Sequence, residues 1–119
     1  MRVLYFVAFS LMASIEFAAA DTMVVRGGEH GDFTRLTIAV RPDAKWEVEA
    51  QERSLTLLFD ALGQHFDLSQ AFVRIGRERI SAISFTEGAL HLDLSCECET
   101  RVFRAGKNLI AIDVADSKE

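Results

Sequence analysis

The chain has 119 residues, of which 50% are hydrophobic, with a formal net charge of −5 at pH 7 and two cysteines. This length predicts one small domain that can bury a core without obligatory disulfides or metals. The acidic balance argues against nucleic acid as a partner, because nucleic-acid-binding domains present basic surfaces.

The first twenty residues predict a cleavable signal peptide. An arginine precedes an apolar run over residues 3–15, and three alanines at 18–20 resemble an A-x-A cleavage site. The run is shorter than the roughly 18 apolar residues expected of a membrane span. We therefore expect cleavage after Ala20, no stable membrane anchor afterwards, and a periplasmic or secreted domain over residues 21–119.

In the first half of the mature chain, apolar and polar residues alternate with a period of two in short segments. This pattern predicts strands at residues 23–26, 35–40, 46–50 and 54–59. Gly27 and Gly28 are expected to end the first strand. Adjacent Leu57 and Leu58 suggest that the fourth strand is buried on both faces.

Residues 60–76 are less regular and predict a crossover that holds either a short helical turn or an edge strand. Beyond it, alternation predicts strands at residues 80–85, 90–95, 100–104 and 108–114. Seven or eight short strands at this spacing indicate an all-β fold, a small two-sheet β-sandwich.

A shift of 54 residues brings the second half of the domain onto the first without a gap. It predicts a pseudo-duplicated three-strand unit, with copies at residues 33–60 and 87–114; the alternative is chance phasing of two alternating patterns. The matched pairs include Leu36 with Leu90, Val48 with Val102, and Leu55 with Leu109.

The leader and the paired units resemble the AMIN domain, the amidase N-terminal targeting module of bacterial envelope proteins. Residues 54–60 (SLTLLFD) and 108–113 (NLIAID) carry the resemblance, since each closing strand ends in an aspartate. The likeness covers residues 23–116 and implies a non-catalytic β-sandwich that holds a partner to the cell wall, a septal complex or a secretion complex. Two features depart from the family: no catalytic domain follows Glu119, and residues 96–99 read CECE. The chain is therefore expected to be either a fragment of a longer protein or a stand-alone relative.

Cys96 and Cys98 continue the parity of the apolar residues that precede them. Three interpretations remain open: a disulfide at a bent strand end, two buried inert cysteines, or a metal or redox pair. A structural zinc ion takes four ligands, and the sequence has no second cysteine pair to complete such a set.

No recognisable catalytic constellation is present, so we expect no enzyme, no cofactor and no metal site. The candidate binding surface combines a basic run, suited to acidic wall polymers, with the polar face of a strand. Both are also typical of plain solvated surface. Its residues are Arg74, Arg77, Arg79, His91, Asp93 and Glu97.

Trp46 shares the apolar parity of its strand and is expected in the core, although an exposed indole would be a surface for sugar stacking. The sequence predicts a non-enzymatic envelope module that contacts peptidoglycan, the cell-wall glycan, or a periplasmic protein partner. The alternative is a small periplasmic thiol- or metal-binding protein that uses Cys96 and Cys98.

Overall fold

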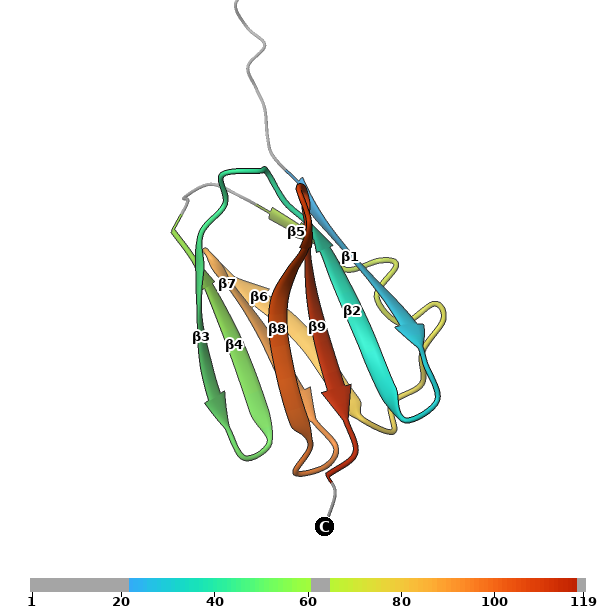
Figure 1. The fold of residues 1–119 in the computed structure, drawn as a ribbon. Helices are drawn as coiled ribbons and strands as arrows, with labels where there is room; N and C mark the ends of the chain where they lie inside the picture. Colours follow the sequence, from blue (N-terminus) through green and yellow to red (C-terminus); the bar gives the residue numbers. More distant parts are fainter. Residues whose placement is uncertain (1–21, 61–64, 118–119) are drawn as a thin grey trace, which may run out of the picture.

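The computed structural model describes residues 22–60 and 65–117, which form two packed β-sheets (Figure 1). One sheet has five strands in the order β5-β1-β2-β9-β8, and the other has four in the order β3-β4-β7-β6. The strands are β1 (Thr22–Glu29), β2 (Phe33–Ala39), β3 (Trp46–Gln51), β4 (Ser54–Phe59), β5 (His65–Asp67), β6 (Ile80–Thr86), β7 (Ala89–Leu94), β8 (Glu99–Gly106) and β9 (Leu109–Ala115). The predicted all-β, two-sheet architecture is confirmed.

The alternation read from the sequence produces the core. Every second residue of β2 and β4 is buried, because side chains alternate between the two faces of a strand. Leu58 is half-buried on the outer face, so β4 is fully buried on one face only, and the prediction of burial on both faces is wrong. The two sheets contribute to one cluster that includes Leu36, Ile38, Leu55, Leu57, Leu90, Leu92, Ile110 and Ile112.

The two halves of the chain follow one topological plan. The strands β1, β2, β3 and β4 of the first half correspond to β6, β7, β8 and β9 of the second. Exchanging each strand for its counterpart changes the order β1-β2-β9-β8 of one sheet into β6-β7-β4-β3, which is the order of the other sheet. The hairpin that closes each half lies in the sheet begun by the other half, since β4 pairs with β7 and β9 pairs with β2. Neither half can complete a sheet alone, so we expect both halves to fold as one unit.

The register refines the shift between the halves. Leu36 pairs with Ile112, and Leu90 pairs with Leu57. If Leu36 corresponds to Leu90, then Ile112 corresponds to Leu57, which is a shift of 55 residues in the closing strand. The uniform shift of 54, which placed Leu55 on Leu109, is therefore one residue out of register in this strand.

The crossover between the halves closes one side of the sandwich. It contains the edge strand β5, which pairs in parallel with β1. The buried residues Phe66, Ala71 and Ile75 extend the core there. β1 continues through Gly27 to Glu29, so the prediction that glycine ends this strand is wrong. The absence of a side chain at Gly27 lets the backbone lie close to the crossover, which explains why the strand continues.

The predicted signal peptide and its cleavage point lie outside the described residues. In residues 22–60 and 65–117 there is no helix of the length and apolarity that crossing a membrane requires.

Candidate functional site

Arg79, predicted as part of a basic surface, is held in an internal network. Its side chain is 13% exposed, and its Nε donates to Asp116 Oδ1 at 2.9 Å. The Nη1 atom donates to Glu29 Oε1 at 3.3 Å and to Thr34 Oγ1 at 3.1 Å, and Nη2 donates to the Gly31 carbonyl at 2.9 Å. The guanidinium thus ties the start of β6 to the β1–β2 hairpin and to the segment after β9.

The carboxylates around Arg79 are organised by the same contacts. Hydrogen bonding from Arg79 lowers the pKa of Asp116. Thr34 is buried and donates to Glu29 Oε1 at 2.7 Å. The Gly76 amide donates to Glu29 Oε2 at 3.2 Å. The protein's own groups therefore occupy this arginine and both oxygens of Glu29.

The other residues of the predicted surface are spread over two regions. Arg77 stacks on the ring of Phe72, with its Cζ 3.8 Å from the ring centroid, and it donates to the Ser81 carbonyl at 2.7 Å. His91 lies on the outer face of β7, in hydrogen-bonding contact with Thr56 and Thr86 at 3.3 and 3.1 Å. The exposed members are Arg74, Arg77, Asp93 and Glu97.

Cys96 and Cys98 form a disulfide in the turn between β7 and β8, with Cα atoms 5.0 Å apart. Both residues are half-buried, so they are not the inert buried pair of the second interpretation. Within the described ranges, no group of three or more His, Cys, Asp or Glu side chains is placed to hold a metal ion.

A more organised group lies on the outer face of the five-stranded sheet. Arg35, Asp113 and Arg101 occupy neighbouring positions across β2, β9 and β8. Arg35 donates from Nε to Asp113 Oδ1 at 2.7 Å and from Nη2 to Oδ2 at 2.9 Å. This two-pronged contact lowers the pKa of Asp113 and raises that of Arg35.

Aromatic rings separate the cations on this face. The Cζ of Arg35 lies 5.4 Å from the ring centroids of both Phe33 and Phe103. Arg101 lies 4.5 Å from the Phe103 centroid, and His30 stacks on Phe33 with centroids 4.8 Å apart. Such stacking holds a guanidinium flat and leaves its in-plane N–H groups available for hydrogen bonds.

This arrangement borders a shallow hollow of about 460 Å³, lined by Asp32, Phe33, Arg35, Glu99, Thr100, Arg101, Asp113 and Ala115. Arg101 is exposed, and among the described residues it has no hydrogen bond or close ion pair. Its guanidinium therefore lies over the Phe103 ring, and its N–H donors have no acceptor among the described residues. We call the group formed by Arg35, Arg101, Phe103 and Asp113 the arginine face.

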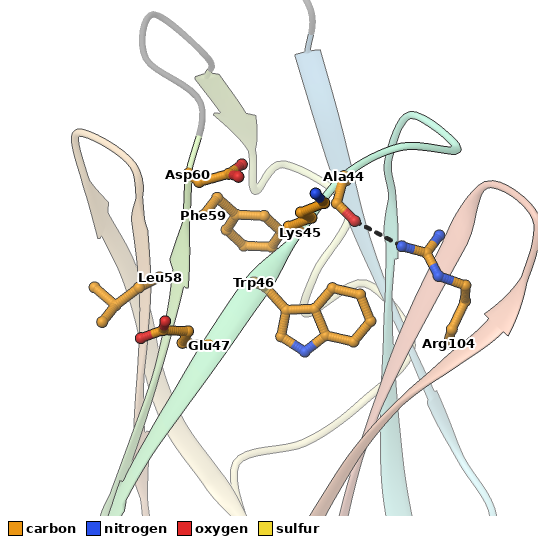
Figure 2. Close-up of a pocket in the computed structure, with 8 residues that line it drawn as sticks. All are labelled: Ala44, Lys45, Trp46, Glu47, Leu58, Phe59, Asp60 and Arg104. Atoms are coloured by element: carbon orange, nitrogen blue, oxygen red, sulfur yellow. Dashed lines mark hydrogen bonds between the residues drawn. The ribbon is translucent and has the colours of Figure 1, made fainter.

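A second hollow lies between the edge strands β3 and β8 (Figure 2). Trp46 is half-buried there and packs against the core cluster, so it lies at the margin of the predicted core. The Cζ of Arg104 lies 5.1 Å from the centroid of the Trp46 ring, and the Arg104 guanidinium donates to the Ala44 carbonyl at 2.7 Å. The volume is about 770 Å³, and the lining includes the charged groups Lys45, Glu47 and Asp60.

Sequence reasoning missed the arginine face. Arg35 and Arg101 were visible as polar residues alternating with core positions, but their proximity depends on β9 lying between β2 and β8. Comparison of the chain with protein-family models, with curated proteins and with solved structures gave no match.

Proposed function

We propose that this chain is an exported, non-enzymatic binding module of the bacterial envelope, and that the arginine face contacts peptidoglycan. The leader-like first twenty residues and the resemblance to the AMIN domain support the compartment and the class. The leading alternative for the partner is a periplasmic protein that uses the same face.

The proposal rests on the contacts that Arg101 makes and on the hydrogen-bond donors that it leaves unused. Its guanidinium is oriented by Phe103 and has unused donors, so little side-chain freedom is lost when it binds a carboxylate. A carboxylate accepts two parallel hydrogen bonds from a guanidinium, as Asp113 does from Arg35 beside it.

The charges around the hollow favour a ligand that carries both signs. Arg101 offers a cation, whereas Asp32 and Glu99 offer carboxylates on the same rim. The stem peptides of peptidoglycan combine carboxylates with amines and amides on a sugar chain. Such a polymer can match this mixed rim at several points, which a uniformly charged polymer cannot do.

The test is retention of the purified protein on isolated cell-wall sacculi at low salt. Wild-type protein should sediment with the sacculi, and Arg101→Gln should reduce retention at least about fivefold, since one charge-assisted contact is worth about 1–2 kcal/mol. Arg74→Gln is the matched control, because Arg74 is also exposed but lies in the crossover away from this face.

Two results would count against the proposal. Retention of the wild type no greater than that of an unrelated β-sandwich would remove peptidoglycan as the ligand. Equal losses for Arg101→Gln and Arg74→Gln would indicate adsorption by general charge instead of binding at the arginine face.

The thiol or metal function based on Cys96 and Cys98 remains the alternative from another class. It requires the reduced form, because thiolates and not disulfide sulfurs bind metals. Metal analysis of the protein purified from its own compartment, before and after mild reduction, tests it. A stoichiometric metal that appears on reduction would favour this alternative.

A further inference from the structure

Strand β3 is exposed on both of its faces. Five of its six residues are exposed, and Trp46 is half-buried. Trp46, Val48 and Ala50 pair with the buried β4 residues and so have the parity of the core, yet Val48 is 43% exposed. β3 is also the last strand of its sheet, so one row of its backbone N–H and C=O groups has no strand partner. An apolar, unpaired edge of this kind is a template for pairing with another strand.

The opposite side of the sandwich is closed. There β5 and the crossover join the two sheets, and the ring of Phe66 in β5 lies 5.5 Å from that of Phe85 in β6. Ala71 and Ile75 lie against Gly27 of β1. On the other side of the sandwich, the edge strands are β3 in one sheet and β8 in the other, and these two strands occupy equivalent places in the two halves of the chain. In the part of the chain that the structure describes, no third element pairs with either edge.

The two open edges run in opposite directions. β3 and β9 both point toward the lower end of Figure 1, and β8 is antiparallel to β9. A rotation of 180° about an axis parallel to the strands would bring β3 of one copy beside β8 of another. The paired strands would then be antiparallel, and the same contact would occur twice, as in other two-fold interfaces.

We propose that this edge is the interface of a symmetric dimer, in which β3 of each copy pairs with β8 of the other. Placing Val48 opposite Val102 of the second copy fixes the register. The same register puts Glu49 opposite Arg101 and Trp46 opposite Arg104. One alignment thus gives an apolar pair, an ion pair and a cation–aromatic pair, each of which stabilises neighbouring strands.

The charges select this arrangement over the other symmetric one. A two-fold axis perpendicular to the sheets would pair β3 with β3 and β8 with β8. With Val48 opposite its own copy, Glu47 of each chain would face Glu49 of the other, and like charges on facing strands destabilise a sheet. The proposed pairing leaves the outer face of the five-stranded sheet open, but it shares Arg101 with the proposed peptidoglycan contact, because Glu49 of the second copy lies opposite this residue. Val48→Lys therefore tests the dimer without altering the arginine face.

The first test is sedimentation equilibrium of the protein expressed from the full sequence. We expect a reversible dimer with a dissociation constant below roughly 100 μM. Val48→Lys should raise that constant at least about tenfold, because a charge on the core-facing side of an edge strand blocks pairing. The control is Val73→Lys, since Val73 is 64% exposed and lies in the crossover. A wild type that stays monomeric at that concentration, or a dimer that Val48→Lys leaves intact, would overturn the proposal.

The second test separates the two symmetric arrangements. Glu49→Gln should raise the dissociation constant of the proposed dimer by about threefold to fivefold, because it removes the charge opposite Arg101. In the arrangement with β3 against β3, the same substitution removes a repulsion and lowers the constant. Glu87→Gln, in the distant β6–β7 turn, should change nothing. An unchanged or lowered constant for Glu49→Gln would exclude the pairing of β3 with β8.

Discussion

Arg35 and Asp113 lie 78 residues apart in the chain, yet the guanidinium donates two hydrogen bonds to the one carboxylate, at 2.7 and 2.9 Å. The two residues face each other on β2 and β9, which belong to different halves of the chain. Their side chains are 33% and 14% exposed, so water screens the pair only in part. The contact bridges β2 and β9, one of the two strand pairs that join the halves.

Asp113→Asn should lower the free energy of unfolding at pH 7 by about 1–2 kcal/mol, the value of charge-assisted hydrogen bonds that are partly shielded. Because Arg35 lowers the pKa of Asp113 in the folded protein, this contribution is complete above the unfolded pKa of about 3.9. It disappears as the pH falls through the lower, folded pKa. Urea unfolding of both proteins from pH 7 to pH 2 measures the difference.

The control for this prediction is Asp93→Asn, because Asp93 is an exposed carboxylate on the four-stranded sheet. Its unfolding curve should follow that of the wild type at every pH. If the stability difference between wild type and Asp113→Asn did not shrink as the pH fell from 4 to 2, the ion pair would not be its source.

Arg79→Ala should destabilise the fold by about 2 kcal/mol, because it leaves the buried Thr34 hydroxyl without its donor and removes the hydrogen bonds to Asp116 and to the Gly31 carbonyl. Arg74→Ala should stay within about 0.5 kcal/mol of the wild type, as is usual for exposed positions. Urea unfolding at neutral pH compares the two. Similar stabilities would mean that Arg79 is a surface cation and would return it to the list of binding residues.

The strands could be predicted from the sequence because local alternation decides them. The bounds of β4, residues 54–59, were predicted to the residue. The course of β1 through Gly27 could not be predicted, since it depends on Ala71 and Ile75, which lie more than forty residues later. The same limit applies to β5, whose three residues form a strand only because β1 is beside them.

The candidate site was less predictable than the fold. Arg79 was grouped with Arg74 and Arg77 because the three are neighbours in the sequence. Its partners, Glu29 and Asp116, come from the two ends of the domain, and no local pattern indicates them. Trp46 had the parity of a core residue, but parity does not distinguish the middle of a sheet from its edge.

Replacing both Cys96 and Cys98 by Ser should lower stability by only about 1.5 kcal/mol, because the disulfide closes a loop of three residues and so restricts the unfolded chain little. The domain should remain folded, since its core cluster contains neither residue among its buried members. Urea unfolding measures the change, and mass measurement of the wild type should show a gain of two hydrogen atoms on reduction. Complete unfolding of the double variant would show that this turn is essential to the fold.

Gly27→Ala should destabilise the domain by about 1–3 kcal/mol, the usual range for overpacking. A Cβ at this position would lie 2.6 Å from the carbonyl oxygen of Ala71 and 3.0 Å from the Cγ2 of Ile75, and the carbonyl belongs to the backbone, which cannot move aside easily. Gly28→Ala is the matched control on the next residue, because the nearest atom to its Cβ is the Nε2 of His30, 3.8 Å away.

Gly28→Ala should therefore leave stability unchanged or raise it slightly, since alanine restricts the unfolded chain more than glycine does. Thermal unfolding of the two variants beside the wild type measures this difference. Equal effects at Gly27 and Gly28 would mean that β1 does not lie against the crossover. The crossover would then no longer be shown to close one side of the sandwich, and the contrast with the open side at β3 and β8 would lose its support.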